Sequence, residues 1–232
     1  MERRSFLGAC AVLGSALATA AHAQDGAPRT YARVRLVDEH GAALRARDVA
    51  PDTNYVFQYP YAATPCFLLR LGAPVQPVAA LRRRDGGAYE WRGGVGPDRA
   101  LVAFSAICAH KLAYPTRDVS FIRYQRDRSA TSGGHVIHCC ADHSVYDPAE
   151  GARVVAGPAP QPLAAIVLDH DAQADELYAT GTLGAEQFDA FFAQYGLKLA
   201  LEYGSTNRAR AAVTGTTVVR ELTRYCRNTV QC

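Results

Sequence analysis

The sequence predicts an all-β fold, an antiparallel sandwich or barrel, with a helix and a tail at its C-terminal end. Short apolar segments follow one another closely along most of the chain, and Gly and Pro separate them. No segment with a long helical period interrupts them before position 184. The 232 residues, of which 49% are hydrophobic and 20% charged, suffice for one ordinary domain with a sizeable core. The net charge of +3 is too small to indicate a nucleic-acid-binding protein.

Residues 1–23 are expected to be an export signal. Arg3 and Arg4 precede a weakly hydrophobic, Ala-rich run without charges, and a small-x-small cleavage site ends at Ala23. The arginine pair followed by Phe6 and Leu7 resembles a twin-arginine signal, which predicts a periplasmic protein. Two alternatives stay open, namely an ordinary secretion signal and an uncleaved N-terminal membrane anchor.

Several segments after the signal have the composition and spacing of β-strands. The strand candidates are 31–37, 55–60, 66–71, 100–107, 119–125, 135–139, 164–168 and 176–180. A charged, Gly-containing run at 82–87 is expected to form a solvated hairpin tip rather than a binding patch. The segment 100–107 is expected to be a buried strand and leads directly into the first of two metal-binding motifs.

A helix is predicted from Gly184 to Gly196, because four aromatic residues recur at helical spacing and glycines stand at both ends. The aromatic residues are Phe188, Phe191, Phe192 and Tyr195. We expect this stripe to pack against the sheet, with docking of a partner as the alternative. From position 205 onward the tail contains five Arg and one Glu.

Two short motifs carry candidate metal ligands, each on its own tight loop. Cys108 and His110 form a C-x-H motif, and Cys140 and His143 form a C-x-x-H motif. In this order the motifs match the ligand pattern of a Rieske [2Fe–2S] centre, in which two Cys hold one iron and two His hold the other. Zinc also accepts two Cys and two His, but structural zinc sites usually pair like ligands.

The surroundings of both motifs resemble the Rieske family, and within it the small subunit of arsenite oxidase. The similar stretches are 93–98 and 102–111 around the first motif, 144–148 after the second, and the proline loop at 157–160. The likeness covers roughly residues 30–183. It implies a Rieske domain at 24–183 with a small cluster-binding subdomain at about 104–162, and a helical extension with a basic tail at 184–232.

The resemblance also implies roles for single residues. Cys108 and Cys140 would bind one iron, and His110 and His143 would bind the other, exposed iron. The resemblance further implies residues that support the cluster without binding iron. Ser144 and Tyr146 would donate hydrogen bonds to its sulfur atoms, and the loop of Gly157 and Pro158 would cover it.

Three departures from the family pattern stand out. Ala113 and Asp142 occupy the positions where high-potential members carry a disulfide between the two loops, so we expect a potential in the middle of the range of about −150 to +300 mV. The 29 residues between His110 and Cys140 exceed the usual spacing, which predicts an extra Arg-rich hairpin at 123–128. One residue is missing after the second His. An alignment on positions 144–148 would instead make Cys139 the ligand and place Asp142 where the His belongs.

Four cysteines remain beyond the expected ligands and the signal. They are Cys66, Cys139, Cys226 and Cys232. An even number in an oxidising compartment allows two disulfides in three pairings, of which Cys226 with Cys232 is the local choice.

The resemblance implies an electron-transfer protein rather than a stand-alone catalyst. It would pass single electrons from a catalytic, molybdenum-containing oxidoreductase to a c-type cytochrome. The alternatives are the Rieske subunit of a quinol–cytochrome c reductase complex, which needs a retained anchor and a high potential, and a relative that has lost its cluster. An oxygenase component is not expected, because the chain has no second, mononuclear-iron domain.

Overall fold

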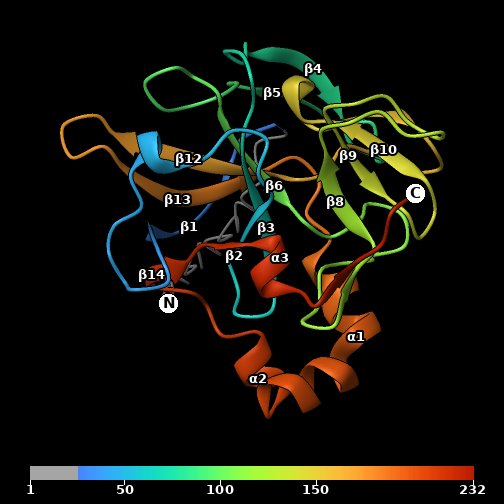
Figure 1. The fold of residues 1–232 in the computed structure, drawn as a ribbon. Helices are drawn as coiled ribbons and strands as arrows, with labels where there is room; N and C mark the ends of the chain where they lie inside the picture. Colours follow the sequence, from blue (N-terminus) through green and yellow to red (C-terminus); the bar gives the residue numbers. More distant parts are fainter. Residues whose placement is uncertain (1–25) are drawn as a thin grey trace, which may run out of the picture.

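The computed structural model describes residues 26–232, so the expected export signal lies outside the described residues. Figure 1 shows that strands make up most of the fold, with helices near the C-terminal end. The expectation of an all-β, mainly antiparallel fold with a C-terminal helix is therefore confirmed. Within the described range, no helix is long and apolar enough to cross a membrane.

A large sheet organises the molecule. Its eight strands follow the order β14-β1-β13-β12-β6-β3-β2-β15. Neighbours are antiparallel except β1 and β14, which run parallel. The strands are β1 (Arg29–Val37), β2 (Tyr55–Gln58), β3 (Pro65–Arg70), β6 (Leu101–Ser105), β12 (Ala165–Asp171), β13 (Glu176–Leu183), β14 (Gly215–Val218) and β15 (Arg220–Glu221).

The central strand β3 is buried on both faces. Phe67 and Leu69 belong to the core cluster on one side, whereas Cys66 and Leu68 belong to the cluster on the other side. Because successive side chains of a strand point to opposite faces, this alternation requires cover on both sides of the sheet. The neighbouring strand β6 divides its side chains in the same way. The sheet thus gives the first metal-binding loop, which follows β6, a rigid base.

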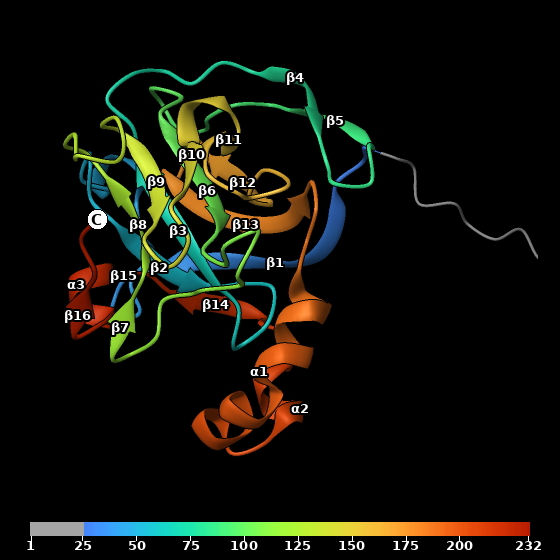
Figure 2. The same cartoon turned by 90° about the vertical axis from the view of Figure 1, so that its right-hand side faces the viewer.

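A small antiparallel sheet packs on one face of the large one, as Figure 2 shows. Its order is β11-β10-β9-β8. The strands are β8 (Ile122–Gln125), β9 (Val136–Cys139), β10 (Ser144–Asp147) and β11 (Arg153–Ala156). Ile122, Ile137 and Tyr146 share one core cluster with Phe104 of the large sheet and with Trp91. The two sheets therefore bury a common interior, and the small sheet carries the second metal-binding loop between β9 and β10.

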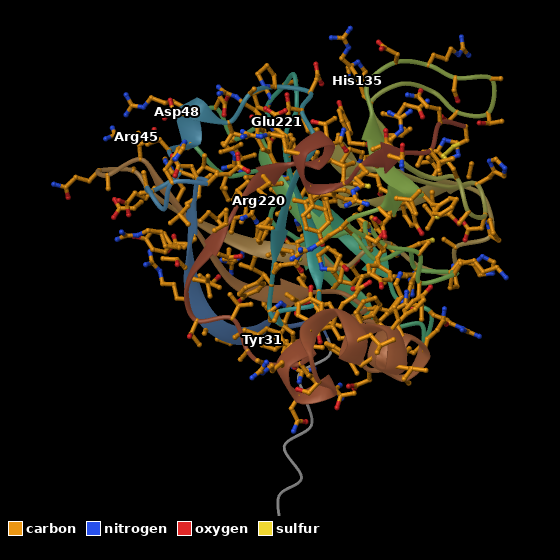
Figure 3. All side chains as sticks on the ribbon, turned by 60° about the horizontal axis from the view of Figure 1, so that its bottom comes forward. Tyr31, Arg45, Asp48, His135, Arg220 and Glu221 are labelled. Atoms are coloured by element: carbon orange, nitrogen blue, oxygen red, sulfur yellow. A yellow bond between two sulfur atoms is a disulfide. The ribbon has the colours of Figure 1, made fainter. Side chains whose placement is uncertain are left out.

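A separate hairpin joins β4 (Val78–Arg82) to β5 (Ala88–Trp91). The charged turn between the two strands confirms the hairpin tip predicted at 82–87. The longer loop between β8 and β9 ends at His135, which Figure 3 shows at the foot of a projecting loop. The Nδ1 atom of His135 and the hydroxyl of Tyr124 share a hydrogen bond of 3.0 Å, and the His135 side chain lies on the surface.

The C-terminal helices begin later and continue further than the sequence predicts. Helix α1 spans Phe188–Tyr203, and the short helices α2 (Thr206–Ala209) and α3 (Leu222–Tyr225) follow. Gly196 lies inside α1, so its predicted role as the helix stop is wrong, and Gly204 with φ +82° ends the helix instead. An αL residue closes a helix at no steric cost only when it lacks a Cβ.

The aromatic stripe of α1 packs as a core, although its main partner is not the sheet. Phe188 and Phe191 share a cluster with Ile107, Leu112 and Tyr114, which flank or belong to the first metal-binding loop. The rings of Tyr114 and Phe191 meet edge to face with centroids 4.8 Å apart. Helix α1 therefore supports that loop from behind.

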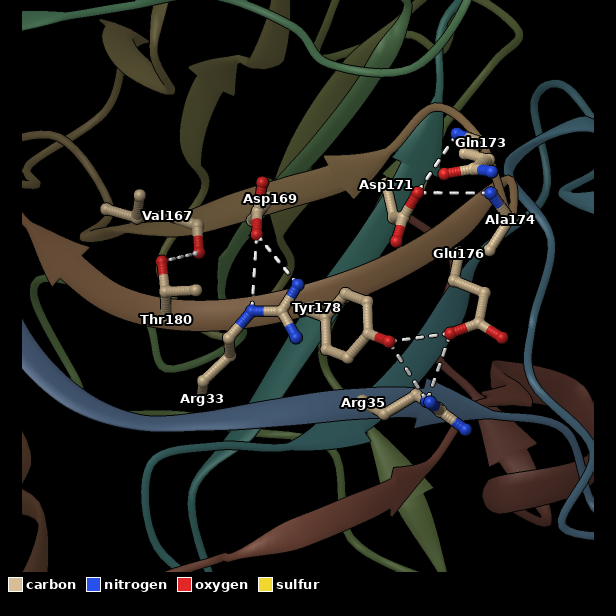
Figure 4. A network of polar contacts seen from close by, with 10 residues as sticks. All are labelled: Arg33, Arg35, Val167, Asp169, Asp171, Gln173, Ala174, Glu176, Tyr178 and Thr180. Carbon is tan, nitrogen blue, oxygen red and sulfur yellow. Dashed lines mark hydrogen bonds and ion pairs between the residues drawn. The ribbon is translucent and has the colours of Figure 1, made fainter.

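Paired charges cover the outer face of β1, β12 and β13 (Figure 4). The Arg33 guanidinium lies 3.3 Å from the Tyr178 ring centre and pairs with Asp169 at 2.9 Å. The Tyr178 hydroxyl donates to Glu176 at 2.6 Å, and Arg35 pairs with the same carboxylate at 3.1 Å. This face thus carries paired polar side chains across neighbouring strands, as expected for a sheet face that meets water.

Asp175 closes the turn between β12 and β13. Its carboxylate accepts a hydrogen bond from the Arg47 guanidinium at 2.7 Å and contacts His170 Nε2 at 2.9 Å. The hydrogen bonds from Arg47, and then that from His170, lower the pKa of Asp175 to about 2. Its φ is +57°, a left-handed conformation that Asp and Asn adopt more readily than other residues.

We predict that Asp175→Asn makes the fold less sensitive to acid. A folded-state pKa of about 2 lies below the unfolded value of about 3.9, so the carboxylate stabilises the fold above pH 4 and loses that effect as the pH falls towards 2. The free energy of unfolding, measured by urea denaturation between pH 2 and 6, should fall less steeply for the variant. Asp127→Asn is the control, because Asp127 is exposed and pairs only with its neighbour Arg126. Equal slopes for all three proteins would contradict the role of Asp175.

Candidate metal centre

The first loop leaves β6 and closes on itself within a few residues. The Cys108 N–H donates to the Ala113 carbonyl at 2.8 Å, and the Leu112 N–H donates to the Cys108 carbonyl at 3.1 Å. Leu112 takes a left-handed φ of +56° to complete the turn. As a result Cys108 is fully buried, whereas the side chain of His110 keeps 34% of its surface exposed.

The second loop joins β9 to β10, with Cys139 paired opposite Ser144. Asp142 bends its side chain inward, and its carboxylate accepts the Ser144 N–H at 3.0 Å. His143 follows with φ +58° and points outward to the surface. The loop therefore presents Cys139 and Asp142 to the interior.

The two loops bring together four donor groups: two thiols, a carboxylate and an imidazole. Ligand atoms of Cys108, Cys139 and Asp142 all lie within 4.8 Å of one another. The carboxylate lies 3.4 Å from Cys108 Sγ and 2.8 Å from His110 Nδ1. The sulfur atoms are buried, and the imidazole is on the solvent side.

The structure places the residues of the second motif in a register different from the expected one. Cys140 is joined to Cys232 by a disulfide, with 5.6 Å between their Cα atoms, so its sulfur is not available to a metal. His143 lies against His138, with ring centroids 5.8 Å apart, and not beside Cys108. Adjacent residues at a strand end face opposite sides, so a shift by one residue exchanges one ligand pair for the other.

The alternative alignment on positions 144–148 predicts this arrangement, because it selects Cys139 and Asp142 as the residues at the ligand positions. The local pairing of Cys226 with Cys232 does not form, because Cys232 is bonded to Cys140. Cys66 and Cys226 are free, buried thiols. No sequence signal pointed to Cys232 as the partner of Cys140, because 92 residues separate the two.

The electrostatics favour the deprotonated forms of Cys108 and Asp142. A hydrogen bond from the Cys139 thiol lowers the pKa of Cys108 to about 7, against the effect of burial and with help from the Tyr146 hydroxyl. The same hydrogen bond raises the pKa of Cys139. Burial opposes ionisation of Asp142, but the hydrogen bonds from Ser144, Cys139 and His110 outweigh it, and its pKa lies below the usual value. Metal ligands must be deprotonated, so Cys108 and Asp142 are close to the required state, whereas Cys139 would have to release its proton to a binding metal.

Two buried hydroxyl groups, those of Tyr146 and Ser144, lie at the metal-binding loops, and the role that the resemblance implies for them stays a prediction. The Tyr146 Oη lies 3.3 Å from Cys108 Sγ and accepts the Ala109 N–H at 3.0 Å. The Ser144 Oγ is fully buried and has no hydrogen-bond partner among the described residues. A buried hydroxyl without a partner costs about 1–3 kcal/mol. It therefore indicates an acceptor that the polypeptide itself does not supply.

The proline loop lies directly on the second metal-binding loop. Gly157 has φ +83°, and a Cβ built there would stand 2.6 Å from the Cα of Ser144. Only glycine allows this approach of one backbone to another. The position of Gly157 agrees with the implied cover over the site, and a role of the neighbouring Pro158 stays a prediction.

These residues fit a [2Fe–2S] cluster with an altered ligand set. Cys108 and Cys139 would hold the inner iron, and His110 and Asp142 the outer one, while Ser144 and Tyr146 would donate hydrogen bonds to sulfur. When bound, such a cluster accepts and releases one electron. A carboxylate in place of a neutral imidazole adds negative charge, which lowers the reduction potential.

We predict opposite results for the two adjacent cysteines. Cys139→Ser should abolish the cluster because it removes a buried sulfur donor, whereas Cys140→Ser should keep full iron and acid-labile sulfide contents. Iron and sulfide analysis and the EPR spectrum of the reduced protein measure both contents. Loss of iron in Cys140→Ser and its retention in Cys139→Ser would show that Cys140, and not Cys139, is the second cysteine ligand.

We further predict that Ser144→Ala lowers the potential without loss of the fold. One lost hydrogen bond to a charged acceptor is worth about 1.5–3 kcal/mol. Since a tenfold change in a one-electron equilibrium corresponds to 59 mV, the expected decrease is at most roughly 65–130 mV. Ser120→Ala is the control, because Ser120 is buried but donates to the Ile122 carbonyl at 2.6 Å. A redox titration followed by EPR measures the potentials, and an unchanged value in Ser144→Ala would refute the role.

Known proteins share part of this sequence and fold. No family model matches the sequence. The iodate reductase subunit IdrB of Denitromonas iodatirespirans is 29% identical over 188 residues, which cover 79% of this chain and 82% of that protein. The soluble domain of Rieske protein II (soxF) from Sulfolobus acidocaldarius is 26% identical over 66% of this chain and 78% of that chain, with a TM-score of 0.47. The chain is thus similar in sequence to an iodate reductase subunit over most of the length of both proteins.

Proposed function

We propose that the chain is the periplasmic electron-transfer subunit of an oxidoreductase complex, in which it carries single electrons between a catalytic subunit and a c-type cytochrome. The arrangement of the donor groups carries this proposal. Two buried sulfur ligands lie on the protein side, and His110 alone of the four extends well into solvent. A docked partner can therefore touch a ligand of the outer iron directly.

The likeness to an iodate reductase subunit supports an oxidoreductase as partner. We propose that the catalytic subunit contains molybdenum and reduces an oxyanion of the iodate type. Electrons would then flow from the cytochrome through this chain to the catalytic subunit. This direction is opposite to the one expected from the arsenite oxidase resemblance. The carboxylate ligand supports it, because a lower potential makes the reduced cluster a better electron donor.

The disulfide between Cys140 and Cys232 supports export from the cytoplasm. Disulfides form and persist in oxidising compartments such as the periplasm and are rare in the cytosol. An iron–sulfur cluster is assembled in the cytoplasm, so we propose that the protein is exported in its folded state by the arginine-pair signal.

Purification of the native complex tests the proposal. The chain, tagged on the chromosome between the signal and residue 26, should be recovered from the periplasmic fraction together with a molybdenum-containing subunit. When excess iodate is added to the reduced complex, the cluster should be reoxidised within one turnover. The cluster of the isolated reduced chain should stay reduced under the same conditions. Recovery of the chain alone, or from the cytoplasmic fraction, would refute the proposal.

Cys139→Ser provides the matched variant. It removes a proposed cluster ligand that is fully buried, so the surface offered to the partner stays the same. We expect it to copurify with the catalytic subunit while cytochrome-driven iodate reduction is lost. Retained activity in that complex would show that electrons bypass this chain.

A further inference from the structure

The second metal-binding loop carries potential metal ligands on two opposite faces. Cys139 and Asp142 face Cys108 and His110, as described above. The next pair along the chain, Cys140 and His143, faces the opposite way, towards the C-terminal segment. This rear face lies outside the proposed [2Fe–2S] site.

Four potential soft or borderline ligands meet on the rear face. Nitrogen atoms of His138 and His143 and the sulfur of Cys232 all lie within 4.8 Å of one another. The Cys232 Sγ is 3.4 Å from Nδ1 and 3.5 Å from Nε2 of His138. The fourth, Cys140 Sγ, is bonded to Cys232 Sγ. Two sulfurs and two imidazoles are thus gathered in one place.

His138 supplies an independent sign that the rear face is built for a ligand. It is fully buried, and among the described residues its ring contacts only the disulfide sulfur as a hydrogen-bond partner. A disulfide sulfur is a poor partner for a buried imidazole nitrogen, and buried polar groups in folded proteins usually have good ones. His143 is exposed, so an ion has a route from solvent.

The C-terminal segment keeps its place without the disulfide. β16 (Asn228–Thr229) pairs in parallel with β7 (Val119–Ser120), and the Val230 N–H donates to the Ser120 carbonyl at 2.9 Å. Arg123 donates to the Val230 carbonyl at 3.3 Å and to the Gln231 side chain at 3.1 Å. Cys140 and Cys232 would therefore remain adjacent after reduction.

We propose that the rear face is a redox-controlled zinc site formed by His138, Cys140, His143 and Cys232. In the oxidised protein two of the four ligands, the sulfurs of Cys140 and Cys232, are bonded to each other and cannot bind a metal. A dithiol reductant breaks the S–S bond, delivers two electrons and two protons, and itself becomes a disulfide. Zn²⁺ then displaces the two thiol protons and binds two thiolates and two neutral imidazoles, the donor set that it holds in tetrahedral sites.

Zinc titration of the cluster-loaded chain tests the proposal. The protein is treated anaerobically with a phosphine reductant, alkylation mapping confirms that Cys140 and Cys232 are free, and Zn²⁺ is added and then removed by desalting. The reduced protein should retain one more zinc per chain than the untreated protein, with its iron content unchanged. Bound Zn²⁺ should also protect both thiols from alkylation.

Variants separate this site from nonspecific binding. Cys232→Ser and His143→Gly should each weaken zinc binding at least about 10- to 100-fold, the loss that even an outer-shell partner of a metal causes. Glycine suits position 143, where φ is +58°, so the fold should tolerate the change. Cys226→Ser removes a different buried thiol and should bind zinc as the wild type does.

Four outcomes would overturn the proposal. The first is equal zinc content in the reduced and untreated proteins, and the second is unchanged binding in both Cys232→Ser and His143→Gly. The third is a disulfide that resists reduction in the folded protein. Loss of iron upon zinc uptake would also refute it, because the ion would then have entered the cluster site. All these readouts are independent of electron transfer to a partner.

Discussion

The carboxylate of Asp142 holds the two metal-binding loops together. It accepts the N–H of Ser144 on its own loop and reaches His110 and Cys108 on the other. A non-covalent, charged contact thus connects the two loops, and the same carboxylate is a proposed ligand.

The rest of the fold keeps this link in register. β6 and β9, which lead into the two loops, belong to sheets that share one core, and helix α1 backs the first loop. Gly157 brings the proline loop onto the second. Each loop is therefore fixed on the side away from the donors, and little freedom remains for the carboxylate to swing away.

Much of the scaffold was predictable from the sequence, because long apolar strands such as β3 and β6 show their period locally. The short strands β14, β15 and β16 were not predicted, since their pairing depends on segments far away in the chain. Gly196 failed as a helix stop because packing of the aromatic stripe outweighs the modest cost of one glycine inside a helix. In the metal centre, the first motif and the hydroxyls of Ser144 and Tyr146 were predicted, but the choice between Cys139 and Cys140 depended on strand alternation and on a distant thiol.

The disulfide also changes the topology of the chain. It closes a covalent ring over a separation of 92 residues, which contains β10 to β13 and all three α-helices. In the chain-entropy treatment, a ring of this size removes about 4–5 kcal/mol of conformational freedom from the unfolded state. The helical extension, which projects from the body (Figure 2), is thereby anchored at both of its ends. With the disulfide formed, the extension cannot detach from the rest of the fold as a free chain end would.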